Sequence, residues 1–594
     1  MADIHYRVEA WDTHAHYFDL TLTIPAPAAL QVVSLPAWIP GSYLLREFAR
    51  HLSGLSATQG SRAVAVQQQD KATWIIACSG RAALLLSYRI YAFDNSVRSA
   101  FLDAQRGFFN ASSLCLRVHG REQEVHRLSV TRLAAGWQVA TSMPATGEGQ
   151  YAAANYDELL DHPFELGRFW QGSFTAAGIE HQVVVSGALP VFDGERLLAD
   201  AQHICETQIS FWHDSSAERS GPVVGVGLPF NSYIFFLNAV DEGYGGLEHR
   251  ASTALIAPRR DLPRRGLPEV TQGYVRLLGL ISHEYFHSWN VKRLKPANFV
   301  TLDYSRENYT ELLWFFEGFT SYYDDLMLVR SGLIDETRYL KMLAVTITGV
   351  LATPGRKVQS LAQSSFDAWV KYYRPDENTI NSTISYYGKG SLLALALDLS
   401  LRTSAQVGAP CSLDELMRGL WQRFDGGPVS EADILALLAE LAGADLALEA
   451  SRWVHGTADL PLPRLLEQMG VHWHHGQATL AQRLGLRVSE TPTTGVLITQ
   501  VLAGSLAMDA GLCAGDELLA CNDWRLRRLD DALLTLIPEQ NALRWLVSRD
   551  QRVLSFTVLL PPAAFASAGA PTLLTLANQA SAPLVSLRRA WLTG

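Results

Sequence analysis

The sequence predicts a multidomain α+β protein. With 594 residues the chain is too long for one hydrophobic core, and about 150 residues per domain suggests roughly four domains. Residues up to about 165 alternate in polarity, those from about 268 repeat with a helical period, and those after 475 mix short strands and helices. Apolar residues make up 48% and charged residues 18% of the chain, which is typical of a globular protein.

The N-terminal segment, 1–165, is predicted to form an antiparallel β domain. In FDLTLTI, Phe18 and Leu20 alternate with Asp19 and Thr21, and LSYRIY shows the same alternation. A period of two buries one face of a strand and leaves the other in water. Short strands separated by Gly/Pro turns favour a sandwich or an antiparallel sheet.

The middle of the chain is predicted to hold a mixed domain over 166–400 and a helical region over 401–470. Strand-like pieces such as HQVVVSG and SYIFFLNAV come first, and the stretches 276–294 and 310–329 then read as helices. Ser412 with Glu415, and Ser430 with Asp433, form the spacing of capping boxes at two helix starts.

The C-terminal segment, 476–561, resembles a PDZ domain, with AGLCAGDELL (510–519) as its most specific piece. A PDZ domain adds a peptide as a strand and holds its terminal carboxylate, here at a loop with Leu484, Gly485 and Leu486. A peptide C-terminus is therefore an expected partner, and a purely structural PDZ domain is the alternative. The tail, 562–594, is weakly patterned and is left unassigned.

Charge and hydropathy exclude several classes of protein. A net charge of −10 argues against nucleic acid as a partner. No apolar run approaches the roughly 20 residues of a membrane span. The start MADIHYRVEAWD lacks the apolar core of a secretory signal peptide. We therefore expect a cytoplasmic protein without a membrane partner. The six cysteines show neither zinc-site spacing nor a disulfide framework.

The run HEYFH is the most informative motif of the chain. Positions i and i+4 lie on one helix face, so His283 and His287 can bind one Zn²⁺ through nitrogen. Glu284 is then placed to hold the attacking water as general base. The motif arises by accident in roughly a few per cent of chains this long, and two solvated histidines on a surface helix are the alternative.

A catalytic zinc usually takes three protein ligands, so a third is needed. Glu317 is the candidate, because a lone carboxylate in the apolar stretch LWFFEGFTSYY must be paired or bound to metal. A neighbouring Arg or Tyr could satisfy it instead, and Glu307 and Glu311 compete from a more polar stretch. Asp324 is a weak candidate for the hydrogen-bond partner of a ligand.

These residues stand in long segments that resemble the glycyl aminopeptidase family of PDZ-containing gluzincin zinc metallopeptidases. The resemblance rests on HEYFHSWNVKRLKP (283–296), ELLWFFEGFTSYYDDLMLVRSGL (311–333), AWIPGSYLLREFARH (37–51) and YAFDNSVR (91–98). It implies a thermolysin-like zinc metallopeptidase catalytic domain at 166–400, one zinc held by His283, His287 and Glu317, and Glu284 as base. The wider group often has an acidic residue four positions after the third ligand, where this chain has Ser321.

Two further motifs match the wider group of zinc aminopeptidases. In GGLEH, Gly245 and Gly246 let a substrate backbone approach, and Glu248 can pair with the free α-ammonium of a peptide. In YYGKG, alignment on the KG pair selects Tyr387 as donor to the oxyanion, with Tyr386 as the alternate. The alternative for GGLEH is a glycine-containing turn with a solvated Glu. The alternative for YYGKG is a Tyr that only packs at a helix start.

The sequence therefore predicts a zinc-dependent aminopeptidase that acts on peptides with a free N-terminus. The resemblance implies a preference for small first residues, Gly and Ala. Two other functions stay open: a zinc endopeptidase, and a non-catalytic scaffold that binds peptides through the PDZ domain.

Overall fold

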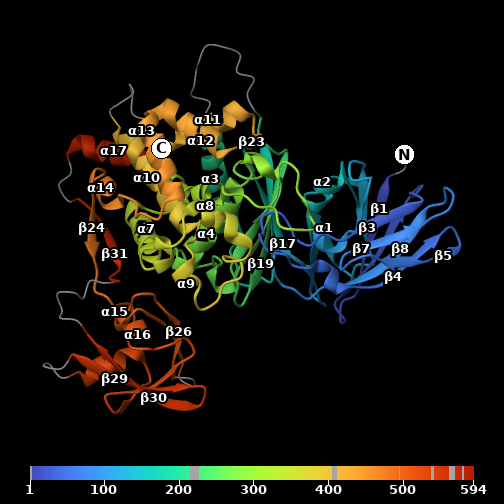
Figure 1. The fold of residues 1–594 in the computed structure, drawn as a ribbon. Coiled ribbons are helices and arrows are strands. Elements are labelled where there is room, and N and C mark those ends of the chain that lie inside the picture. Colours follow the sequence, from blue (N-terminus) through green and yellow to red (C-terminus); the bar gives the residue numbers. More distant parts are fainter. Residues whose placement is uncertain are drawn as a thin grey trace, which may run out of the picture. The chain divides into compact units, whose positions relative to one another are not determined.

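The structure is a computed structural model that describes residues 3–213, 227–404, 411–491, 493, 495–536, 541–560, 569–577 and 581–594. The predicted segments 1–165, 166–400, 401–470, 476–561 and 562–594 each include residues outside this set. The chain forms two compact units, Met1–Tyr309 with Trp421–Pro428, and Thr310–Leu420 with Val429–Gly594 (Figure 1). Each unit is described by itself.

The first unit begins with the β domain that the alternation predicts. In β2 the side chains of Phe18, Leu20, Leu22 and Ile24 are buried while those between them are partly exposed. The register is antiparallel apart from the parallel pair β1–β12. The strands, in sheet order, are β14 (Ala145–Gly147), β15 (Gln150–Ala153), β12 (His126–Thr131), β1 (Ile4–Asp12), β2 (Tyr17–Ile24), β8 (Leu84–Tyr91), β4 (Leu52–Gln59) and β5 (Arg62–Val64).

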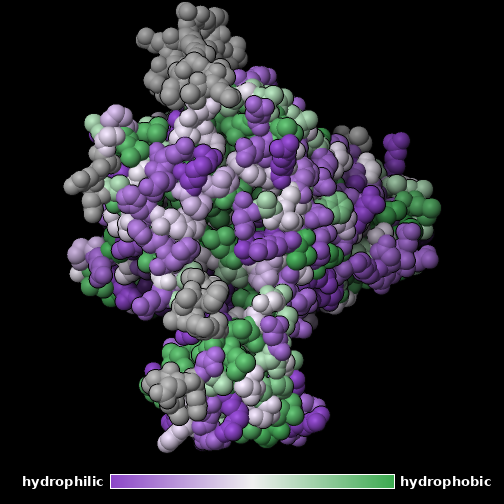
Figure 2. All heavy atoms as spheres, turned by 60° about the vertical axis from the view of Figure 1, so that its left-hand side comes forward, coloured by the Kyte–Doolittle hydropathy of each residue, from purple (hydrophilic) through white to green (hydrophobic). Residues whose placement is uncertain are grey.

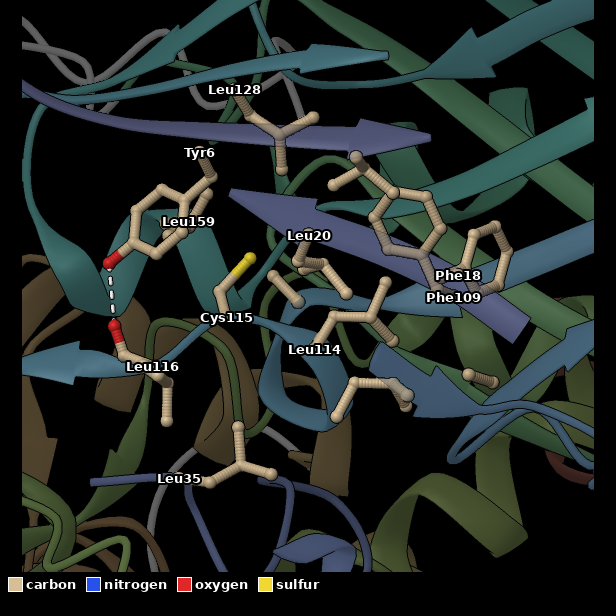
Figure 3. Packing of buried hydrophobic residues seen from close by; sticks show 14 of the residues in the cluster. Tyr6, Phe18, Leu20, Leu35, Phe109, Leu114, Cys115, Leu116, Leu128 and Leu159 are labelled. Atoms are coloured by element: carbon tan, nitrogen blue, oxygen red, sulfur yellow. Dashed lines mark hydrogen bonds between the residues drawn. The ribbon is translucent and has the colours of Figure 1, made fainter. Parts of the chain in front are cut away.

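Two smaller sheets and two short helices complete this domain. Figure 3 shows Phe18 beside Phe109 in the core, with the Cys115 thiol among apolar side chains. The buried Tyr6 hydroxyl donates to the carbonyl of Leu116 at 2.7 Å. The elements are β13 (Gln138–Thr141), β16 (Pro163–Gly167), β10 (Arg106–Asn110) and β9 (Ala100–Leu102); β11 (Arg117–Val118), β3 (Leu30–Ser34), β7 (Thr73–Ala77) and β6 (Val66–Gln68); and α1 (Ala111–Leu114) and α2 (Tyr156–Leu160).

The rest of the first unit is a mixed sheet with two long helices, α3 (Gly194–Trp212) and α4 (Gln272–Phe286). In this sheet β18, β19 and β21 run parallel, and β20 pairs antiparallel with β21 at the edge. Helix α4 packs against β20 and β21. The strands, in order, are β17 (Trp170–Ala176), β18 (Ile179–Ser186), β19 (Ser232–Val240), β21 (Ser252–Pro258) and β20 (Gly245–Glu248). A strand edge therefore lies against the helix that carries HEYFH.

Helix α4 ends earlier than the 276–294 stretch predicts. His287 is its C-cap, and the chain then turns back: the amide of Lys292 donates to the carbonyl of His287 at 3.1 Å. Val291 takes a φ of 108°, which is unfavourable for a β-branched residue and is held by the hydrogen bonds of the turn. The helical period does not show this stop, because no Gly or Pro marks it.

The second unit is mostly helical, as the periodicity predicts. The stretch 310–329 is divided at Glu317 into α5 (Leu313–Phe316) and α6 (Gly318–Arg330). The capping box at Ser430 and Asp433 is confirmed at the start of α12. The other helices are α7 (Glu336–Leu351), α8 (Leu361–Phe366), α9 (Thr379–Ser382), α10 (Gly388–Thr403), α11 (Leu413–Phe424, whose end belongs to the first unit), α12 (Glu431–Ala442), α13 (Ala444–His455) and α14 (Leu462–Glu467).

The C-terminal part of the second unit has its own core and sheet. The core gathers Leu486, Ile498, Leu518 and Trp545. The elements are α15 (Leu480–Leu484), β25 (Leu486–Thr491), β26 (Gly495–Val501), α16 (Leu506–Asp509), β27 (Glu517–Cys521), β28 (Trp524–Arg525), β29 (Ala542–Arg549) and β30 (Arg552–Leu559), with sheet order β25-β26-β27-β29-β30 and β28 beside β27.

The tail that the sequence leaves unassigned returns to the helices of the second unit. Its strand β31 (Thr572–Leu576) pairs with β24 (Val471–His475), about 100 residues earlier in the chain. Its helix α17 (Ala582–Thr593) buries Trp591, whose indole N–H donates to the Tyr322 hydroxyl at 2.9 Å. These contacts connect segments far apart in sequence, so local patterning does not reveal them.

On the face shown in Figure 2, hydrophilic residues in purple are interspersed with hydrophobic residues in green. Within the described ranges, no helix has both the length and the apolarity that a membrane crossing needs.

Candidate functional site

The last turn of α4 brings two imidazole rings together. His283 and His287 are one helical turn apart, and their Nε2 atoms lie 3.1 Å from each other with the ring planes at 86°. Thr271 is the N-cap of this helix, and its side chain accepts a hydrogen bond from the amide of Tyr274. Nε2 atoms that both bind one tetrahedral Zn²⁺ at about 2.0–2.1 Å would be roughly 3.3 Å apart. The observed pair therefore fits a shared metal ion.

The turn after α4 fixes the tautomer of His287. Its Nδ1 lies 2.8 Å from the carbonyl oxygen of Asn290 and must donate to it, which leaves the Nε2 lone pair for a metal. Sequence reasoning missed this partner, since it is a backbone carbonyl and leaves no signal in the residue types. The weak candidate Asp324 lies in α6 of the second unit, half-buried, and accepts from the amide of Asp325 at 2.6 Å.

Glu284 is held against the edge strand β20. Its side chain is buried, and a Cβ added to Gly246 would lie 2.1 Å from its Oε1 atom. Gly246 is therefore the residue that lets the strand approach this carboxylate. Carboxylate and imidazole atoms of Glu248, Glu284 and His287 lie within 4.8 Å of one another. Glu248 and Glu284, the predicted substrate-binding residue and the predicted base, thus lie beside a histidine of the HEYFH run.

Glu248 ends strand β20 and is enclosed by a turn from the N-terminal domain. Its side chain is 4% exposed. Gly41, with a φ of 89°, is so close that an added Cβ would lie 2.5 Å from Oε1 of Glu248. Arg98 donates from Nη2 to the carbonyl of Gly246 at 3.1 Å and lies near Gly245. Sequence reasoning gave Gly41 and Arg98 no role, although both stand in segments that carry the family resemblance.

In the second unit, Glu317 occupies the break between α5 and α6. It is 2% exposed, whereas its competitor Glu311 is exposed and Glu307 is half-buried. Glu317 is thus the most buried of the three carboxylates that the sequence offers as a third ligand. Its neighbour Gly318 contacts α10: a Cβ there would lie 2.6 Å from Cα of Gly390.

The close approach of α6 and α10 places the YYGKG segment near Glu317. The pKa of Tyr387 is raised well above its usual value, first by burial and then by the negative charge of Glu317. Tyr387 caps α10 and is half-buried, whereas Tyr386 is fully buried. The pKa of Tyr372, whose ring lies 5.6 Å from that of Tyr387, is raised first by burial and also by Glu317. Of the two tyrosines in YYGKG, Tyr387 is the more accessible.

Comparisons with protein families and with solved structures relate this chain to aminopeptidases. Residues 5–168 match the model of the Peptidase M61 N-terminal domain, and residues 276–393 match that of M61 glycyl aminopeptidase. The crystal structure of the aminopeptidase N family protein from Idiomarina loihiensis is 36% identical, with a TM-score of 0.91 and 100% of both chains covered. An M1 zinc metallopeptidase from Deinococcus radiodurans is 17% identical over 78% of this chain and 94% of its own, with a TM-score of 0.47. Curated proteins gave no match.

Proposed function

We propose, since this chain belongs to the M61 glycyl aminopeptidase family of zinc metallopeptidases, that it hydrolyses the first peptide bond of peptides with a free amino end. The observation that carries this proposal is the convergence of Glu248, Glu284 and His287 within 4.8 Å. One site then holds a carboxylate that can pair with the α-ammonium of the substrate, a base for the attacking water and a metal ligand.

We assign one Zn²⁺ per chain to His283, His287 and Glu317. Two imidazoles and one carboxylate are the ligand set of a large class of catalytic zinc sites, and they leave a position open. A zinc ion held by these residues would polarise the scissile carbonyl and lower the pKa of a water to about 7.

Glu284 acts as the general base. Its carboxylate takes a proton from the attacking water and gives it to the nitrogen of the leaving amine, so that both products leave neutral at the reacting atoms. Burial of Glu284 and contact with Gly246 support this role, because they restrict the carboxylate to one side of the strand edge.

Glu248 and the edge of β20 bind the substrate. An exposed strand edge can add an extended peptide through main-chain hydrogen bonds. Glu248 at the end of that strand pairs with the α-ammonium, and Gly41 lies directly against its carboxylate. A buried carboxylate placed to pair with a free amino end supports an aminopeptidase rather than an endopeptidase.

Tyr387 donates its phenolic hydrogen to the developing oxyanion. Its raised pKa supports the role, because the hydroxyl stays protonated at neutral pH and remains a donor.

We also propose that the substrates have small first residues, Gly and Ala. In addition, we propose that the sheet around β25–β30 is a PDZ domain that binds peptide C-termini. The loop with Leu484, Gly485 and Leu486 would then hold their terminal carboxylate.

The test is a set of matched substrates, glycyl p-nitroanilide and its N-acetyl derivative, with and without o-phenanthroline. We expect the free amine to be cleaved, the acetylated compound to be rejected, and zinc to restore the chelated protein. The E284Q variant should retain zinc, measured by plasma emission, and lose several orders of magnitude in kcat. Cleavage of the acetylated substrate would identify an endopeptidase, and a zinc content well below one per chain would favour a scaffold.

A further inference from the structure

A cavity of about 120 Å³ in the first unit is lined by Glu248 together with residues of the N-terminal domain and of the segment after α4. This volume is several times the roughly 10–15 Å³ that one ordered water needs, so a short side chain fits. Aromatic residues from two segments form part of its wall: Trp38 and Tyr43 from the N-terminal domain, and Phe299 and Tyr304 from the loop after α4. Charged residues form another part.

Most of the charges in this wall are paired with one another. Lys292 lies 3.1 Å from Asp161, whose other oxygen accepts from the amide of Arg250 at 2.8 Å. The Arg250 guanidinium pairs with Asp157. Burial by itself raises the pKa of Asp161, yet Lys292 and Arg250 hold it well below its usual value, so Asp161 is ionised. Each of these two carboxylates is thus neutralised by a cation of the wall.

Glu248 and Lys295 are the two charged groups that this pairing leaves over. Both line the cavity. Among the described residues, neither the Glu248 carboxylate nor the Lys295 ammonium has a hydrogen-bond or ion-pair partner. Burial, with Arg250 and Lys292, lowers the pKa of Lys295, so an arriving carboxylate would relieve an unfavourable environment. The cavity is therefore complementary to a ligand with one ammonium and one carboxylate.

We propose that Lys295 binds the side-chain carboxylate of an acidic first residue, Asp or Glu, while Glu248 holds the α-ammonium of the same residue. This assignment rests on the proposed aminopeptidase function and adds acidic first residues to its substrates. The aromatic wall excludes water from the pair, which strengthens the contact between carboxylate and ammonium.

The experiment compares kcat/KM for the p-nitroanilides of Asp and Asn, which have nearly the same shape and differ in charge. These anilides carry no C-terminal carboxylate, so any effect of Lys295 on them comes from the side chain. We expect the zinc-loaded wild type to prefer Asp over Asn by 10-fold or more. In K295M the ratio should fall to about one, and K295R should retain part of the preference. The ratio within each variant cancels any general loss of activity.

The control is K341M, on the exposed side of α7, which should leave the ratio at the wild-type value. A wild-type ratio near one together with cleavage of glycyl p-nitroanilide overturns the assignment of Lys295 alone. An unchanged ratio in K295M overturns it as well. A wild type that cleaves none of these anilides overturns the proposed function on which the assignment rests.

Discussion

Gly246 of β20 touches Glu284 of α4: a Cβ on the glycine would stand 2.1 Å from Oε1 of the carboxylate. The strand edge that is proposed to bind the substrate and the helix that carries the proposed base are therefore in direct contact. Any side chain at position 246 must displace the carboxylate, since the backbone of an edge strand in a sheet moves less easily than the end of a glutamate.

The first prediction follows from this contact. G246A should lower kcat/KM for glycyl p-nitroanilide at least 100-fold, because a small misplacement of a base has a large effect on rate. Thermal unfolding should change little, since the carboxylate can rotate aside. G349A, where no atom lies within 4 Å of the added Cβ, is the matched control. Full activity in G246A would argue against the observed position of Glu284.

The second prediction concerns recognition of the amino end. E248Q removes the charge that pairs with the α-ammonium, so we expect KM for free-amine substrates to rise and kcat/KM to fall by about 100-fold. E242Q, an exposed glutamate paired with Arg260, should behave like the wild type. Equal losses in both variants, measured by steady-state kinetics, would remove Glu248 from its proposed role.

The third prediction separates the adjacent tyrosines. Y387F should reduce kcat by about 10²–10³ with little change in KM, the usual effect of losing one oxyanion donor. Y386F is the matched control, since its hydroxyl lies on a fully buried side chain, and it should reduce kcat much less. The opposite order of the two kcat values would assign the oxyanion to Tyr386.

The fourth prediction tests the crossing of α6 and α10. A Cβ at Gly390 would lie 2.8 Å from the carbonyl oxygen of Trp314, and one at Gly318 would lie 2.6 Å from Gly390. G318A and G390A should each lower the free energy of unfolding by about 1–3 kcal/mol, measured in urea, because two backbones must separate. They should also lower kcat, since the crossing positions Glu317 and Tyr387. Unchanged stability would mean that the helices do not pack at these glycines.

The fifth prediction is a loss of stability in acid. Burial lowers the pKa of His126 and of His181 to about 4. The unfolded chain therefore binds more protons than the folded one between pH 6.5 and 4, and stability falls as the pH falls through this window. Each histidine should account for up to about 3 kcal/mol.

Urea unfolding at pH 7, 6 and 5 measures how the free energy of unfolding depends on pH. H126N and H181N should each make stability less dependent on pH, and H475N, at an exposed histidine, should not. If the free energy of unfolding of H126N and H181N depended on pH as strongly as that of the wild type, the low pKa values would be contradicted.

Part of the candidate site is readable from local sequence. The spacing of His283 and His287 is sufficient to place two imidazoles on one face, because the helical period is a local property. The apolar surroundings of Glu317 mark it as buried, and its exposure of 2% agrees. The alternation in 1–165 indicates the β domain for the same reason, since a strand has a fixed period of two.

Other parts depend on residues far apart in the chain. Gly41 and Arg98 meet β20 across more than 140 residues, and β31 pairs with β24 about 100 residues away. The stop of α4 at His287 has no Gly or Pro beside it, and the chain turns there through a hydrogen bond from the amide of Lys292 to the carbonyl of His287. The charge balance of the cavity beside Glu248 arises only when Asp161, Arg250 and Lys292 pair in space.

The sequence by itself determined the β character of the N-terminal domain, the helical character of much of the later chain, the HEYFH pair and the identity of the acidic and tyrosine candidates, because period, composition and residue chemistry are local. Only the tertiary structure decided which carboxylates are paired, which glycines are needed for contact and which lysine is left over. Pairing and packing depend on distances between segments, and these distances are set by the whole fold.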